Sequence, residues 1–217
     1  MEQKEKSRQS IEFIINCAIN EFNEHGEGFS INLLCKKYGI SKGKLYHHFT
    51  SKEDLIAASA CHCFDSITNR VSAYRIDSNL SIEENLHYFY QDRIDSRKKD
   101  PKYLLFVNRM QPIWYSLNDE VIQKISQSKD KWRQSKIKKI LDILRIDEDN
   151  IKAEPVQIAK VINLMYEHTL SSLENQMVNE LKHNEIERAN KSAEELLKYH
   201  DSIMDMILYG GLKEVSD

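Results

Sequence analysis

The sequence has few of the residues that interrupt regular helices, since its 217 residues include six glycines and three prolines. Such scarcity leaves few obligatory breaks in the backbone. Charged residues make up 30% of the chain and hydrophobic residues 41%, a balance that suits long amphipathic helices. The sequence therefore predicts an all-α protein.

Cysteines and long apolar runs are also scarce. The four cysteines are too few and too scattered for a disulfide framework, which agrees with a reducing compartment. Glu12 and Asn16 interrupt the first apolar run, so neither a secretory signal nor a membrane span is indicated. We expect a cytoplasmic protein with no membrane partner.

Negative charge is absent from one segment of an otherwise acidic chain. Residues 30–52 contain five lysines and no Asp or Glu, while the whole protein has a formal net charge of -3. Most lysine runs are solvated helix faces. Clustered lysines also release counterions from phosphates, however, so this segment favours binding to a polyanion.

The same segment has the layout of a helix-turn-helix. Ser30 is placed to cap a helix that Gly39 ends, and Ser41 to cap a short helix from Lys42 to about His48. With Leu45 pointing inward, Phe49 lies on the same side of the short helix. The outward positions are small, basic or hydrogen-bonding, as a major groove requires. They are Gly43, Lys44, Tyr46 and His47.

Longer amphipathic helices follow. Ser81 and Glu84 form a capping box that begins one helix, Pro112 kinks or ends the next, and Asn118 caps a third. We expect helices over residues 53–75, 82–98, 101–112, 119–144, 155–182 and 185–209.

The last of these helices has a heptad seam of apolar residues. Leu196, His200, Ile203 and Ile207 occupy its two repeating positions, which favours packing against a second copy of the chain. We therefore predict a homodimer with these residues at its interface. His200 there is expected to be a hydrogen-bonded interface residue, with a pH switch as the alternative.

With these marks the chain resembles the TetR family of bacterial transcriptional regulators. The resemblance lies in Phe29–Leu55, and its marks are Gly39-Ile40-Ser41, Leu45-Tyr46, Phe49 and Ser51-Lys52-Glu53-Asp54-Leu55. It implies an all-helical homodimer with a three-helix helix-turn-helix DNA-binding domain in residues 1–52. Residues 53–217 are then a helical bundle for ligand binding and dimerisation, with the helix at 53–75 linking the two domains.

The resemblance also implies roles in DNA binding for particular residues. Those matching Lys42, Gly43 and Lys44 face bases in the family, and His47 falls at a variable position that often touches DNA. Phosphates are held by the residues that match Tyr46, His48 and Lys52, together with the cap at Ser30; Ser41 completes the predicted set. Acidic residues flanking the first helix disfavour minor-groove contact by an N-terminal arm.

Aromatic residues in the middle helices fill either a core or a ligand pocket. An apolar cavity with a few polar anchors is the usual form of a small-molecule site, and the resemblance implies one in this region. The predicted lining residues are Tyr90, Arg93, Tyr103, Phe106, Arg109, Trp114, Tyr166 and His168.

The predicted function is sequence-specific binding to double-stranded DNA at a near-palindromic operator, with repression that a small-molecule effector releases. The alternative is an architectural or division-control protein without an inducer. We expect no enzyme, because no nucleophile with a base and no phosphate-binding glycine loop is present. No cofactor or metal is expected either, since Cys61 and Cys63 are two residues apart and point to opposite sides of a helix.

Overall fold

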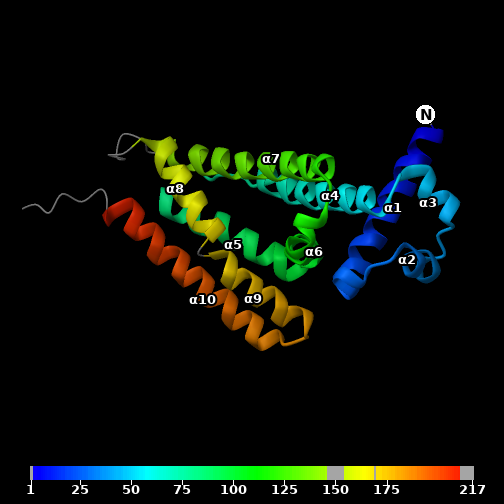
Figure 1. Ribbon diagram of the computed structural model, residues 1–217. Coiled ribbons are helices and arrows are strands. Elements are labelled where there is room, and N and C mark those ends of the chain that lie inside the picture. The colour runs from blue at the N-terminus through cyan, green and yellow to red at the C-terminus, as the bar shows by residue number, and fades with distance from the viewer. Residues whose placement is uncertain (1, 146–153, 169, 211–217) are drawn as a thin grey trace, which may run out of the picture. The chain divides into compact units, whose positions relative to one another are not determined.

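A computed structural model describes residues 2–145, 154–168 and 170–210 (Figure 1). Within these ranges the protein is helical and contains no strand, so the all-α prediction is confirmed. None of the described helices has a long enough apolar stretch to cross a bilayer. The elements are α1 Glu2–His25, η1 Gly26–Gly28, α2 Ile31–Tyr38, α3 Lys42–His48, α4 Lys52–Ala73, α5 Ile82–Lys99, α6 Lys102–Met110, η2 Gln111–Ser116, α7 Asp119–Leu144, α8 Pro155–His168, α9 Leu170–Lys182, α10 Ile186–Asp205 and the π-helical turn η4 Met206–Gly210.

The chain forms two compact units, each built from two separate stretches. Unit 1 comprises Met1–Ile67 and Lys102–Asp130, and unit 2 comprises Thr68–Pro101 and Lys131–Asp217. These units describe packing. The predicted functional division at residue 52 stays a prediction.

Unit 1 has its core around α1. Ile14, Ile19 and Phe22 of α1 are at most 1% exposed, and the Phe22 ring lies 4.9 Å, centroid to centroid, from that of Phe106 on α6. The end of α1 is tied to α6 by the Asn23 side-chain amide, which donates to the Lys102 carbonyl oxygen at 2.8 Å. These contacts fix the C-terminal end of α1, after which the chain continues into α2 and α3.

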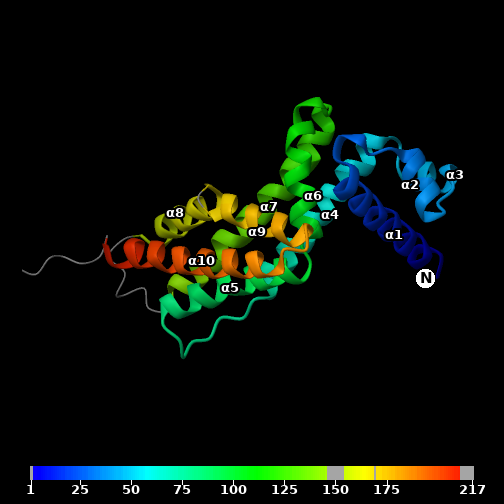
Figure 2. The ribbon, with the colours of Figure 1, turned by 90° about the horizontal axis from the view of Figure 1, so that it is seen from below.

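Unit 2 packs α10 against both α5 and α9, which lie on either side of it (Figure 2). Leu86 of α5, Met177 of α9 and Leu196 of α10 are 0% exposed. The capping box predicted at the start of α5 is present, with Ser81 Oγ accepting from the Glu84 amide and Glu84 accepting from the Ser81 amide.

One predicted helix includes a residue that the structure does not describe. The span expected to be a single helix over 155–182 is described as α8 and α9, on either side of residue 169, which lies outside the described residues. Ser171 Oγ donates to the Glu167 carbonyl oxygen at 2.6 Å.

Candidate nucleic-acid interface

Local hydrogen bonds fix the geometry of the helix-turn-helix. Ser30 Oγ accepts from the Leu33 amide at 3.1 Å, and Ser41 Oγ accepts from the Lys44 amide at 3.1 Å, so both helices begin at capped ends. Between them Gly39 adopts the left-handed conformation, with φ 65° and ψ 27°. A residue with a Cβ is strained there, so glycine is what lets α2 end and the chain turn into α3.

The rotation of α3 about its axis agrees with the prediction. Leu45 is 0% exposed and Phe49 4%, so both belong to the core of unit 1. Tyr46 is 51% exposed, so its side chain lies outside the core. The exposed residues of α3 and its N-cap are here called the α3 face. They are Ser41, Lys42, Gly43, Lys44, Tyr46 and His47.

Gly43 keeps the middle of the α3 face open. A Cβ placed on this residue would meet no heavy atom of the protein within 4 Å. The packing of unit 1 therefore does not require glycine at this position, and the backbone of α3 is accessible to a partner.

Three of the predicted phosphate contacts are less exposed than the residues of this face. Ser30, His48 and Lys52 are each half-buried. Burial lowers the pKa of His48, and the charges of His47 and Lys44 lower it further, so its imidazole favours the neutral form. The Lys52 ammonium lies 5.5 Å from the centroid of the Phe29 ring.

The local charge count of the hairpin needs one correction. Lys37 is one of the five lysines in residues 30–52, a segment without Asp or Glu. In the structure, however, two carboxylates of α1 lie beside it. Its ammonium lies 3.0 Å from Glu21 Oε2 and also forms an ion pair with Glu24. Hydrogen bonds to Glu24 and Glu21 raise the pKa of Lys37. These carboxylates lie outside residues 30–52, so the charge count over that segment missed them.

The eight predicted pocket residues are divided between the two units. In unit 2, Tyr90 and Tyr166 are stacked with centroids 5.1 Å apart, and the Arg93 guanidinium lies 4.7 Å from the centroid of Tyr166. His168 of the same unit is exposed. The other four, Tyr103, Phe106, Arg109 and Trp114, lie in unit 1.

The four pocket candidates of unit 1 each have a neighbour there. Tyr103 lies beside His62, with ring centroids 5.7 Å apart, and Arg109 donates to the Asn23 carbonyl oxygen. Phe106 packs on Phe22, as described above, and Lys129 lies over Trp114. A role of the eight residues in ligand binding stays a prediction.

A buried charge cluster in unit 2 accompanies the stacked rings. Glu174 is 3% exposed, lies 3.5 Å from Arg93 Nη2, forms an ion pair with Arg97 and accepts from the Tyr90 hydroxyl at 3.1 Å. Burial alone would raise the pKa of Glu174, but the charges of Arg97 and Arg93 outweigh it and lower that pKa. The carboxylate is therefore held ionised inside the unit.

A second buried pair joins α7 to α8. Lys136 is 1% exposed, and its ammonium lies 3.2 Å from Glu167 Oε1. Burial lowers the pKa of Lys136 to about 7. Burial opposes ionisation of Glu167 too, but Arg133, 3.1 Å away, and Lys136 lower the pKa of Glu167 to about 2.

The predicted dimer residues on α10 and η4 are mostly buried within their own unit. Leu196 and His200 are 0% exposed, Ile203 is 4% exposed and Ile207 is half-buried. His200 Nε2 lies 2.9 Å from the Tyr166 hydroxyl oxygen, so the expected hydrogen bond exists, with a partner in the same chain. The dimer stays a prediction. Large apolar side chains that remain exposed on α8 and α10 are Val156, Val161, Leu164, Ile186 and Tyr199.

Comparison with known proteins points to one family. Residues 14–59 match the model described as bacterial regulatory proteins, tetR family. The negative transcriptional regulator IcaR of the biofilm operon icaADBC in Staphylococcus aureus is 31% identical over 87 residues, which are 40% of this chain and 47% of IcaR. The match thus spans about half the length of this relative.

Two further likenesses cover different parts of the chain. The transcriptional regulator UidR of Escherichia coli is 50% identical over 46 residues, or 21% of this chain and 24% of UidR. The crystal structure of the transcriptional regulator FadR from Bacillus subtilis, in complex with stearoyl-CoA, has a TM-score of 0.60 at 14% identity. It covers 91% of this chain and 97% of FadR, and at that identity it shows the fold alone.

Proposed function

Because residues 14–59 of this chain match the tetR family of bacterial regulatory proteins, we propose that the protein is a sequence-specific DNA-binding transcriptional regulator. One observation carries the proposal. The α3 face is exposed, contains no acidic residue and presents Lys42 and Lys44 on either side of an accessible glycine. Such a face can approach a major groove closely and reach base acceptors.

The residues of the interface divide into two roles. Lys42, Gly43 and Lys44 read base edges, while Tyr46, His48 and Lys52 contact phosphates and fix the register of the protein on the duplex. Ser30 and Ser41 act through the helix ends that they cap, and His47 lies on the exposed face beside them. Lys37 contributes little, since its charge is matched by Glu21 and Glu24.

We further propose that the protein acts in the cytoplasm as a homodimer that represses transcription. Two recognition helices, one from each copy, would lie in successive major grooves about 34 Å apart, so the operator would be nearly palindromic. Negative regulation is stated in the name of the relative IcaR. The proposal assigns the protein no catalytic activity.

Release from DNA by a small molecule completes the proposal. To reduce operator occupancy about 100-fold, an effector must favour the non-binding conformation by about 2.7 kcal/mol, an ordinary allosteric coupling. The crystal structure of FadR, which has the same fold, contains stearoyl-CoA, and the proposal extends only the capacity for a ligand to this chain.

A DNA-binding protein without an inducer is the second candidate. It is favoured by the packing of Tyr90 and Tyr166, two of the predicted pocket residues, which stack on each other and on His200 with centroids 4.4 to 5.6 Å apart. A thermal-stability screen against metabolites and drugs separates the two candidates, because only the first predicts a compound that raises the melting temperature.

Selection of duplexes from a random library, followed by anisotropy titration at several salt concentrations, tests the proposed function. We expect a near-palindromic selected sequence, tighter binding to it than to its scrambled form, and affinity that falls steeply with salt. Sedimentation of the same sample should give a dimer. A monomeric protein, or one with no preference among duplexes, would contradict the proposal.

A further inference from the structure

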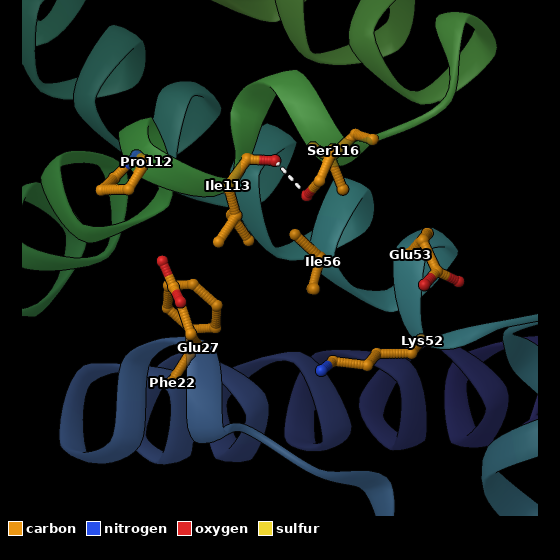
Figure 3. A pocket seen from close by; sticks show the side chains of 9 residues that line it. Phe22, Glu27, Lys52, Glu53, Ile56, Pro112, Ile113 and Ser116 are labelled. Carbon is orange, nitrogen blue, oxygen red and sulfur yellow. Dashed lines mark hydrogen bonds between the residues drawn. The ribbon is translucent and has the colours of Figure 1, made fainter.

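Unit 1 contains a cavity of about 340 Å³ that none of the predicted site residues except Lys52 lines. Its walls come from three segments: the end of α1 with η1, the first turns of α4, and η2 with the residue after it (Figure 3). Pro112 at the start of η2 forms part of one wall. The volume is at the lower end of the range of about 300–1,000 Å³ that is usual for small-molecule pockets.

The base of the cavity is apolar. Phe22 is 1% exposed and Ile56 4%, and Figure 3 shows the side chains of Ile56 and Ile113 pointing across the gap toward the side on which Phe22 lies. Burial of an apolar group between these side chains would contribute favourable free energy. A ligand without an apolar body would leave this surface in contact with water.

Two opposite charges face the same cavity. The Glu27 carboxylate points from η1 into the gap, and the Lys52 side chain extends along its lower edge toward Phe22 (Figure 3). Among the described residues neither Glu27 nor Lys52 forms an ion pair, and the Lys52 ammonium lies 5.5 Å from the centroid of the Phe29 ring. The two groups are thus not paired with each other, so a molecule with a positive and a negative group can contact both.

We propose that this cavity binds a small zwitterion with an apolar body, of the size of a single amino acid. Its ammonium group would pair with Glu27, its carboxylate with Lys52, and its side chain would lie against Phe22, Ile56 and Ile113. The charge complementarity of the two groups and the apolar base select this class over a simple cation, a simple anion or a sugar.

Occupancy of the cavity has a consequence for DNA. Lys52 is one of the predicted phosphate contacts, and a carboxylate that holds its ammonium competes with a phosphate for the same donor. Zwitterion and duplex would then weaken each other by the same factor, since coupling between two ligands is reciprocal. This second part rests on the proposed function, whereas binding of the zwitterion does not.

Three probes that share one hydrocarbon body test the chemical class. Phenylalanine carries both charges, phenethylamine only the ammonium and 3-phenylpropanoate only the carboxylate. We expect saturation-transfer NMR and calorimetry with the full chain, without DNA, to give the strongest binding for phenylalanine. Equal binding of phenylalanine and either singly charged probe, or no binding of all three at millimolar concentration, would overturn the proposal.

Two matched substitutions test the site. Glu27→Gln should weaken phenylalanine binding about fivefold, the effect expected for a partly exposed charge pair. Glu53→Gln removes the same charge from the same rim, but the Glu53 carboxylate points away from the gap in Figure 3, so binding should stay within about twofold of the parent. Equal effects of the two substitutions would place the probe elsewhere and overturn the assignment. Circular dichroism verifies that both variants are folded.

A final titration separates this inference from the proposed function. Duplex affinity is measured with and without saturating phenylalanine, in the parent and in Glu27→Gln. We expect phenylalanine to weaken duplex binding by the parent at least about threefold, and less in the variant. Zwitterion binding without any duplex binding would refute the proposed function but not the site, and duplex binding that phenylalanine leaves unchanged would refute the coupling.

Discussion

The two units use charged side chains in opposite ways. In unit 1, Lys42 and Lys44 are exposed on the α3 face, where water solvates their ammonium groups. In unit 2, Arg93, Arg97 and Lys136 are at most 8% exposed and are held by Glu174 or Glu167. Exposed cations cost little in the folded protein and remain available for binding, whereas buried cations require partners and thereby specify how helices pack.

Removal of a buried carboxylate should have the largest effect. Glu174→Ala leaves Arg93 and Arg97 buried without their partner, so the free energy of unfolding should fall by about 3–5 kcal/mol. Urea unfolding followed by circular dichroism measures the change. Glu195→Ala is the control, because its carboxylate lies 3.9 Å from Lys191 on the surface, and it should cost less than about 0.5 kcal/mol. Similar losses for both would remove the distinction between buried and exposed charges.

The buried lysine should make stability depend on pH. Because burial lowers the pKa of Lys136 from 10.5 to about 7, the unfolded state binds more protons between these values, and this residue makes stability rise with pH across that window. Lys136→Met removes that contribution. The difference in unfolding free energy between parent and Lys136→Met should thus change from pH 7 to pH 10, and a constant difference would show that burial does not perturb this group.

Substitution on the α3 face should leave stability intact and change recognition. Lys44→Ala should weaken binding to the selected duplex by about 1–3 kcal/mol, if the ammonium contacts guanine acceptors. Its urea midpoint should equal that of the parent, since Lys44 is exposed. Anisotropy titrations with selected and scrambled duplexes measure the effect, and equal losses on both would contradict a base contact.

Lys37 provides a further test of this comparison. It lies in the helix-turn-helix of unit 1, but it is paired with carboxylates, as the buried cations of unit 2 are. Lys37→Met should lower the unfolding free energy, since the buried Glu21 carboxylate loses a partner. The salt dependence of duplex affinity should stay the same. Lys52→Met should do the reverse, with unchanged stability and a salt slope smaller by about 1. If Lys37→Met also reduced the slope of the salt dependence, Lys37 would have to contact DNA.

Features encoded in neighbouring residues were predictable from the sequence. The bounds of α3 and α7 agree with the predicted ones, because Ser41 and Asn118 cap them through side-chain hydrogen bonds that a short stretch of sequence specifies. The inward side of α3 followed from the helical period, since Leu45 and Phe49 are four residues apart.

Features that depend on tertiary packing were not predictable in this way. The pairing of Lys37 with Glu21 requires α1 and α2 to meet, and no pattern within residues 30–52 carries that information. The sequence likewise indicated that Tyr90 and Phe106 fill a core or line a pocket, but gave no indication that they belong to different units. The cavity beside Glu27 and Lys52 escaped notice for the same reason, because its three walls are distant in sequence.

A side chain at position 43 would meet no neighbouring residue. Under the proposed function, this position can therefore vary between related proteins that prefer different operators. Glycine within a helix is less stable than alanine by about 0.5–1 kcal/mol, and no neighbouring atom obstructs a larger side chain here. A replacement would strengthen α3 and simultaneously alter what the groove meets. If α3 reads DNA as we propose, single substitutions at this position change the preferred target sequence without a folding penalty.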